Sequence, residues 1–271
     1  MERLLVLRLN AVGCVAEAVL NGVPLGRVGS LGGMGQPGSL SLPVHEFTVS
    51  GVNDVSLVIA PHPPGTPEGT LEPEPQLADG QVGASLQLLL PRVGQSAHPS
   101  SARLLAQLNW APAAGELYHA PVQQTQQVDL PIKFPRWRWL DAPPIEPSET
   151  LKSQLVAYLL GIALGLQRGD PEPLIQASRL RLEELALAYQ RNLADDVGRL
   201  RVHLAQLHAA QPLKPPLPSA TSLVLRWVAG GRLLECLHSS GAPFLQFPVA
   251  GGVHGWPLRV AQVEDKFYVL R

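Results

Sequence analysis

The stretch AVLNGVPLGRVG, residues 18–29, predicts the fold class of the N-terminal half of the chain. Apolar residues lie on both sides of Asn21-Gly22, which is the pattern of two short strands joined by a two-residue turn. Asn-Gly is typical of a type I′ hairpin, because both residues tolerate a positive φ. Backbone geometry therefore explains the turn, and the stretch indicates scaffold rather than a catalytic loop.

Strand patterns recur on both sides of this hairpin, with no helical pattern between them. The runs occupy residues 4–10, 14–20, 55–60, 84–90, 103–110 and 122–132. Many short strands separated by glycine and proline predict an antiparallel sandwich or barrel, and we expect a β-sandwich domain over residues 1–141. The last run alternates poorly and indicates a solvated edge strand. Residues 61–80 are rich in proline and acid, which predicts a long exposed loop.

A proline-rich joint, DAPPIEPSE at residues 141–149, precedes a different pattern. We expect a linker over residues 142–147 and a helix capped by Ser148. This helix is expected to end at Gly169. A second helical region from about Glu172 to His208 is either one long helix or two that are joined near residues 192–198. Short strands follow at residues 222–229, 231–238, 242–248, 258–263 and 266–270. Residues 148–271 are therefore expected to pack helices on an antiparallel sheet, in an α+β protein of two domains.

Each half of the chain resembles a known family. The run from the Asn-Gly turn to a later Gly-x-Asn strand resembles galactose-binding-like jelly-roll domains over about forty residues. The matching positions are Asn21, Gly22, Gly51, Asn53, Leu57 and Ile59. This resemblance implies a β-sandwich. The element order of the C-terminal half resembles an NTF2-like α+β domain, which implies a concave sheet whose pocket serves enzymes and binding modules alike.

Composition sets limits on the partner and the compartment. The chain has 271 residues and a formal net charge of −1, so no global field favours nucleic acid or an anionic membrane. Cys14 and Cys236 lie far apart in strand-like runs, which indicates buried reduced thiols. We expect no signal peptide, and the apolar run 155–166 is shorter than the ~20 residues that span a bilayer. These features predict a cytoplasmic protein, and the abundance of alanine, leucine, glycine, proline and arginine indicates a bacterial source.

The sequence contains no motif that predicts catalysis, a cofactor or a metal site. The eight histidines are scattered, and His203 and His208 are five positions apart, so a helix does not place them together as a zinc pair. The glycine-rich residues 28–38 open no helix and lack lysine, which favours a mobile hairpin loop over a phosphate cradle. Glu183-Glu184, on an arginine-rich helix, predicts surface ion pairs rather than an acid–base pair.

The segment KFPRWRWLDAPP, residues 133–144, is the most unusual in the chain. In an extended conformation Trp137 and Trp139 share one face, and Arg136 and Arg138 share the other. We expect both tryptophans to pack between the two domains, because large aromatic side chains are usually buried. The alternative is a strip that docks a partner, since tryptophan and arginine are enriched at interface hot spots. Stacking on single-stranded nucleic acid is opposed by the neutral net charge.

Three functional hypotheses remain open. The first is a non-catalytic binding or protein-interaction module, such as an accessory or immunity-type factor that occupies a partner protein. The second is an enzyme with a pocket in the C-terminal sheet, which a buried carboxylate or histidine with a strongly shifted pKa would favour. The third is carbohydrate binding by the sandwich, which exposed aromatic side chains on one sheet face would favour.

Overall fold

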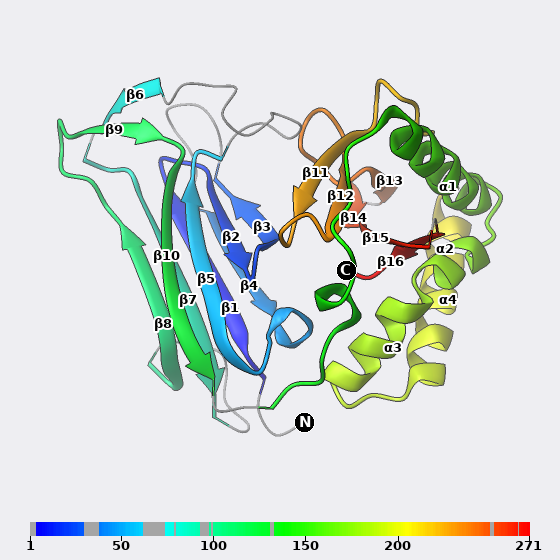
Figure 1. Ribbon diagram of the computed structural model, residues 1–271, viewed down its shortest axis with the longest axis horizontal. Helices are drawn as coiled ribbons and strands as arrows, with labels where there is room; N and C mark the ends of the chain where they lie inside the picture. Colours follow the sequence, from blue (N-terminus) through cyan, green and yellow to red (C-terminus); the bar gives the residue numbers. More distant parts are fainter. Residues whose placement is uncertain are drawn as a thin grey trace. The chain divides into compact units, whose positions relative to one another are not determined.

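A computed structural model describes residues 4–29, 38–61, 74–78, 80–92, 98, 100–130, 133–249, 252–264 and 266–271 (Figure 1). The chain divides into two compact units, and the division falls between Arg136 and Trp137. Residues 137–141 therefore pack with the second unit, although their sequence reads as the end of the first. The expected domain limits, residues 1–141 and 148–271, stay a prediction.

The first unit consists of antiparallel strands. One four-stranded sheet has the order β4-β1-β7-β8, a second has the order β10-β5-β2-β3, and a small sheet pairs β6 with β9. The 3₁₀ turn η1 (His45–Phe47) precedes β5. The strands are β1 (Val6–Val12), β2 (Ala16–Leu20), β3 (Val23–Val28), β4 (Gly38–Pro43), β5 (Gly51–Ile59), β6 (Glu74–Leu77), β7 (Gly83–Pro91), β8 (Ala102–Trp110), β9 (Leu117–Ala120) and β10 (Val122–Leu130).

The hairpin predicted from Asn21-Gly22 is confirmed. Leu20 of β2 pairs with Val23 of β3, so only two residues form the turn. Their φ angles are +52° at Asn21 and +74° at Gly22, which are the left-handed values that a type I′ turn requires. The expected edge strand is also confirmed, because among the described strands β10 pairs with β5 alone and lies at the end of its sheet.

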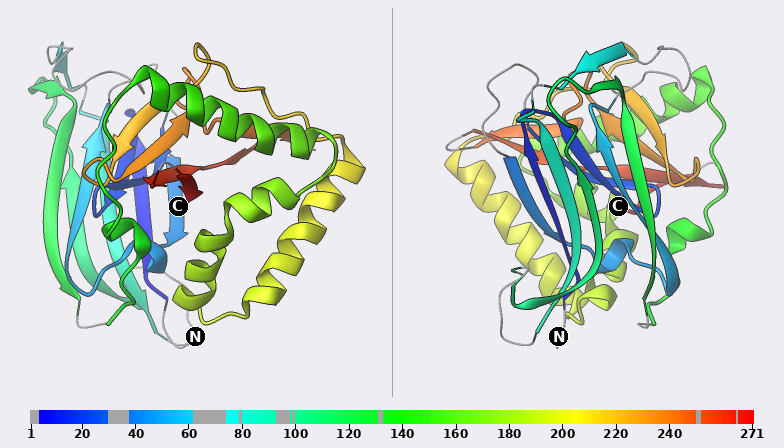
Figure 2. Two further views of the ribbon diagram at one scale, coloured as in Figure 1. Left: turned by 45° about the vertical axis from the view of Figure 1, so that its right-hand side comes forward. Right: turned by 90° about the vertical axis from the view of Figure 1, so that its left-hand side faces the viewer.

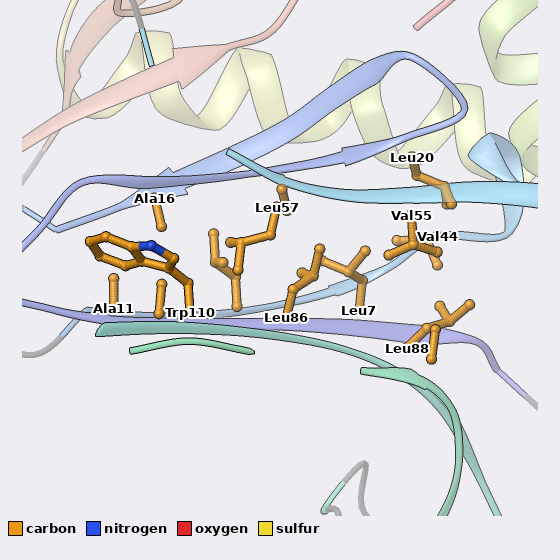
Figure 3. Packing of buried hydrophobic residues seen from close by; sticks show 14 of the residues in the cluster. Leu7, Ala11, Ala16, Leu20, Val44, Val55, Leu57, Leu86, Leu88 and Trp110 are labelled. Carbon is orange, nitrogen blue, oxygen red and sulfur yellow. The ribbon is translucent and has the colours of Figure 1, made fainter. Parts of the chain in front are cut away.

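The core of the first unit lies between its two four-stranded sheets. Leu7 and Leu86 extend from β1 and β7, and Val55 and Leu57 extend toward them from β5 (Figure 3). All four side chains are at most 1% exposed. Trp110 packs in the same cluster. Because burial of each leucine contributes ~1.5–3 kcal/mol, this core is the main stabilising element of the unit.

Two predicted loops lie partly outside the described residues. These undescribed parts are residues 30–37 of the glycine-rich stretch, and residues 62–73 and 79 of the acidic stretch. The described part of the acidic stretch corrects the expectation of a loop throughout, because Glu74–Leu77 forms β6. Proline has no backbone N–H to donate. Pro75 is nevertheless tolerated in β6, because a strand that is paired on one side uses half of its backbone N–H groups.

The second unit combines helices with a four-stranded antiparallel sheet. The sheet has the order β11-β12-β15-β16, and β13 pairs with β14 in a separate hairpin. Residues 252–256, which form β14, were not expected as a strand. The helices are α1 (Glu149–Gln167), α2 (Glu172–Ala177), α3 (Arg179–Ala188) and α4 (Leu193–Ala210), and the turn η2 (Arg138–Leu140) precedes them. The strands are β11 (Val224–Val228), β12 (Leu233–Leu237), β13 (Leu245–Val249), β14 (Gly252–Trp256), β15 (Arg259–Val263) and β16 (Lys266–Val269).

Local capping explains where the helices begin. The Ser148 hydroxyl accepts a hydrogen bond from the Leu151 N–H at 3.0 Å, which confirms the predicted N-cap of α1. The region expected to be one long helix or two is divided into α2, α3 and α4. Gln190 has a φ of +51°, and the Asn192 side chain accepts from the Asp195 N–H at 3.1 Å, so a new helix starts after this break.

A second core forms where the helices cover one face of this sheet (Figure 2). The sheet contributes Leu225, Leu234, Cys236 and Val260 to this core, whereas the neighbouring residues Arg226, Glu235 and Arg259 lie on the opposite face of the sheet. Helix α1 contributes Leu151, Leu155, Leu159, Ile162 and Leu166, at helical spacing. The expected α+β fold is thus confirmed. None of the described helices is both long enough and apolar enough to cross a membrane.

Candidate functional site

The tryptophan–arginine segment does not form an extended strip. Trp137 has an extended backbone, but Arg138–Leu140 turns into the 3₁₀ helix η2. Trp137 and Trp139 are 1% and 3% exposed, whereas Arg136 and Arg138 are exposed. The tryptophans are thus buried, and their packing between domains stays a prediction.

Arg138 attaches this turn to helix α3. Its backbone N–H donates to Oε1 of Glu184 at 2.7 Å. Its guanidinium donates to Oε2 of Glu183 at 2.8 Å and to the carbonyl of Leu180 at 3.2 Å. These bonds hold the backbone of η2 against α3, so Arg138 anchors the fold of the second unit.

Glu184 corrects the expectation that the two glutamates both form surface ion pairs. Glu183 does so with Arg138 and Arg179, but Glu184 is only 5% exposed. Its carboxylate pairs with Arg271, which is 1% exposed. The Arg271 guanidinium also lies 5.4 Å from the centre of the Trp137 ring. One buried carboxylate therefore joins α3, the turn η2 and Arg271, which lies two residues after the end of β16.

A second charged cluster crosses the sheet of the second unit. Glu235 of β12 accepts from Arg226 of β11 at 2.8 Å, and it pairs with Arg259 of β15 at 2.8 Å. The three residues lie directly opposite one another in the strand register. Glu235 and Arg259 are each 5% exposed. The cluster cross-links three strands on the sheet face opposite the one that packs on α1.

An open groove lies on the outer side of β11, next to the start of α1. Its cavity volume is about 560 Å³, which is within the ~300–1,000 Å³ usual for ligand sites. We call it the β11 groove and define it by its lining residues, which are Pro147, Ser148, Glu149, Lys152, Thr221, Leu223, Val224, Leu225 and Trp227. It therefore combines an apolar strand wall with a polar helix start.

The strand wall of the β11 groove has unpaired backbone groups. The Cys236 N–H donates to the carbonyl of Leu258, and the Cys236 carbonyl accepts from Phe244, so both groups point away from β11. Backbone direction alternates along a strand, and Cys236 stands opposite Leu225. The N–H and C=O of Leu225 and Trp227 therefore point outward, where no other described strand pairs with β11.

Trp227 presents its ring to solvent with its polar atom already bonded. Trp227 is 37% exposed, and its indole N–H donates to the carbonyl of Ile145 at 2.8 Å. This bond fixes the orientation of the ring. A ligand can therefore contact the apolar face of Trp227 without leaving a buried donor unpaired.

The cysteines and histidines within the described residues show no arrangement that indicates catalysis or metal binding. Cys14 and Cys236 are both buried, as predicted, and burial raises the pKa of each thiol. His208 accepts from the Leu213 N–H at 3.3 Å, and His45 accepts from the Leu5 N–H at 2.8 Å. Among the described residues, no group of three or more histidine, cysteine or acidic side chains could hold a metal ion.

Comparisons with protein-family models, curated proteins and solved structures give no match for this chain. Sequence reasoning missed the β11 groove and the cluster around Glu235. The run LVLRWVA does alternate, with Arg226 between apolar neighbours, and this pattern predicts a strand. The pattern does not show that the strand lies at the edge of its sheet, because that position depends on the order in which the strands pair. The site therefore rests on the geometry of the second unit.

Proposed function

We propose that this chain is a non-catalytic protein-interaction module and that it binds its partner in the β11 groove. The observation that carries the proposal is the unpaired outer edge of β11 beside a cavity of about 560 Å³. Unpaired strand edges are natural templates for association with another chain. A cytoplasmic location, a bacterial source and an accessory or immunity-type role are parts of this proposal that rest on composition.

Trp227 supports a binding role for the groove. Tryptophan is enriched among the residues that contribute most to protein interfaces, because it buries a large area at a small entropic cost. Its ring is held in place by the bond to Ile145, so little order is lost when a partner contacts it. The rigid ring is therefore the anchor that we expect at the centre of the contact.

The buried carboxylates outside the groove, Glu184 and Glu235, support a structural rather than a catalytic role for these side chains. Glu184 and Glu235 each pair with arginine side chains that are themselves largely buried. Removing one partner of such a pair is strongly destabilising, which is the behaviour of an anchor. In the first unit, the exposed large apolar side chains among the described residues are aliphatic, so the carbohydrate hypothesis gains no specific support.

The test is affinity capture from the cells that make the protein, with matched variants of the tagged chain. The groove variant combines Trp227→Ala with Lys152→Gln. The control is Leu187→Ala, which removes a 58% exposed side chain of α3 that does not line the groove. We expect one partner to be retained by the wild type and the control and reduced roughly tenfold or more on the groove variant, because a hot-spot tryptophan is lost.

Two results would contradict the proposal. One is a partner that binds the groove variant as well as the wild type. The other is the absence of any protein that the wild type and Leu187→Ala retain in common. Circular dichroism and thermal melting of all variants show whether each one is folded, so that a loss of binding is assigned to the surface.

A further inference from the structure

We propose that the partner segment binds as an extended strand added to β11, with an apolar side chain against Trp227 and an acidic residue near Lys152. This inference rests on the proposed function and names the chemistry of the partner. It follows from three features of the β11 groove, namely its backbone, its apolar wall and its charge.

The backbone of the wall specifies an extended chain. Leu225 and Trp227 each direct an N–H and a C=O outward, two residues apart, which is the spacing at which a neighbouring strand exchanges hydrogen bonds. A helix has no free backbone groups along its side and cannot pair with them. A segment that adds to the sheet edge satisfies them through its own main chain.

The apolar wall of the groove determines the chemistry of every second side chain in the partner segment. Successive side chains of a strand point to opposite faces, so Leu225 and Trp227 lie on one face of β11. They line the groove together with Leu223, which directly precedes the strand. An added strand places every second side chain on the same face. These side chains meet the exposed Trp227 ring, which lies beside the buried Leu223 and Leu225, so we expect them to be apolar or β-branched.

The positive charge at the start of α1 favours an acidic residue in the partner segment. Lys152 is half-buried in the groove wall and makes no ion pair with any described residue. Ser148 and the first turn of the 19-residue helix α1 add positive potential at the same end. Glu149 opposes this field but is exposed and better screened by solvent. A carboxylate beside Lys152 therefore complements the groove.

Charge also disfavours a second copy of this chain as the occupant. If two β11 strands pair antiparallel through Leu225 and Trp227, Arg226 stands opposite the Arg226 of the other copy. Like charges directly opposite one another destabilise a strand pair. A partner segment with different side chains avoids this repulsion.

The probe is a blocked fluorescent hexapeptide with valine, valine and aspartate at its odd positions and threonine at its even positions, so that the aspartate lies on the same face as the valines. It is titrated against the full chain by fluorescence anisotropy. We expect saturable binding with a dissociation constant of about 1 mM or tighter. Trp227→Ala should weaken binding at least about fivefold, and Lys152→Gln about threefold with a smaller dependence on salt. Leu187→Ala should change binding by less than about twofold.

Two N-methylated versions of the peptide test the strand geometry without altering the protein. One carries N-methyl groups on odd residues and the other on even residues. A strand that is paired on one side uses the N–H groups of alternate residues only. We therefore expect one version to bind like the parent and the other to lose at least about tenfold. In parallel, NMR spectra should show shifts of the Leu225 and Trp227 amides on binding of the parent peptide.

The outcomes separate this inference from the proposed function. Equal binding of both N-methylated peptides, or no binding at millimolar concentration, overturns strand addition, whereas the capture experiment still decides whether the groove binds a protein. Dimerisation of the chain that Trp227→Ala abolishes would identify a second copy as the occupant and would also overturn the inference. Peptide binding that Trp227→Ala leaves unchanged overturns it as well.

Discussion

At the scale of single residues, Asn53 shows how a motif position acts through hydrogen bonds. Its side-chain Oδ1 accepts from the Asn21 side chain and from the Val49 N–H, each at 2.8 Å. Its amide nitrogen donates to the carbonyls of Val49 and Gly51 at 2.8 and 2.9 Å. The side chain is 0% exposed and uses its whole bonding capacity. Asn21 and Asn53 thus connect the β2–β3 turn to the start of β5.

We expect Asn53→Ala to lower the free energy of unfolding by about 2–4 kcal/mol, because it leaves several enclosed backbone groups without partners. Urea unfolding measures the change. Gln127→Ala is the control, since this exposed side chain makes one bond, to Asp54 at 3.0 Å, and should cost less than about 0.5 kcal/mol. Equal losses in the two variants would show that the Asn53 network does not stabilise the turn.

At the scale of elements, α3 shows how adjacent identical residues acquire different roles. Successive positions on a helix lie about 100° apart, so the two glutamates face different surroundings. The Glu183 side chain is 27% exposed and bonds two exposed arginines, whereas the Glu184 side chain is 6% exposed and pairs with buried Arg271. The helix therefore has one solvated and one buried carboxylate next to each other.

This difference predicts unequal effects of the same chemical change. Glu184→Gln should lower the free energy of unfolding by roughly 3–5 kcal/mol, because a buried guanidinium loses its carboxylate. Glu183→Gln should cost less than about 1 kcal/mol, because solvent screens its ion pairs. Chemical denaturation of the two variants at neutral pH measures both values. A larger effect of Glu183→Gln would contradict the assigned roles.

At the scale of the whole molecule, each unit has its own core, and the groups with the largest pKa shifts lie in the second. Burial raises the pKa of Tyr158 to about 12, with smaller effects from Cys236 and Tyr268. Burial also raises the pKa of Cys236, with a smaller effect from Glu235. In an unfolded chain these groups lose their protons near pH ~10 and ~8.5. Their contribution to stability is therefore complete below pH ~8 and is lost as the pH rises toward the folded values.

We accordingly expect the second unit to lose stability between pH ~9 and ~11. Tyr158→Phe should reduce this loss, because the phenol is removed from a position where its oxygen has no hydrogen-bond partner in the described structure. Urea unfolding followed by tryptophan fluorescence measures the effect, since Trp137, Trp139, Trp227 and Trp256 report on this unit. A variant that loses stability with pH as steeply as the wild type would contradict the role of Tyr158.

Much of the fold could be predicted from local patterns, whereas the candidate site could not. The Asn21-Gly22 turn, the Ser148 cap and the α+β character follow from φ preferences, capping and periodicity, which act between near neighbours in sequence. A break near Asn192 was one of two alternatives that the helical pattern left open, and the strand at residues 74–77 was missed. In those places a cap or a distant pairing partner decides the conformation, and local composition carries little signal.

The sequence by itself determined the α+β character of this protein, most of its strands and helices, and the burial of both cysteines. The tertiary structure alone decided that Glu184 is buried against Arg271, that Glu235 joins Arg226 and Arg259, and that β11 lies at a sheet edge beside α1. The physical reason is the sequence separation over which each kind of interaction acts. Local conformational preferences depend on a few neighbouring residues. Burial, ion pairing and unpaired strand edges depend on which distant segments the fold brings together.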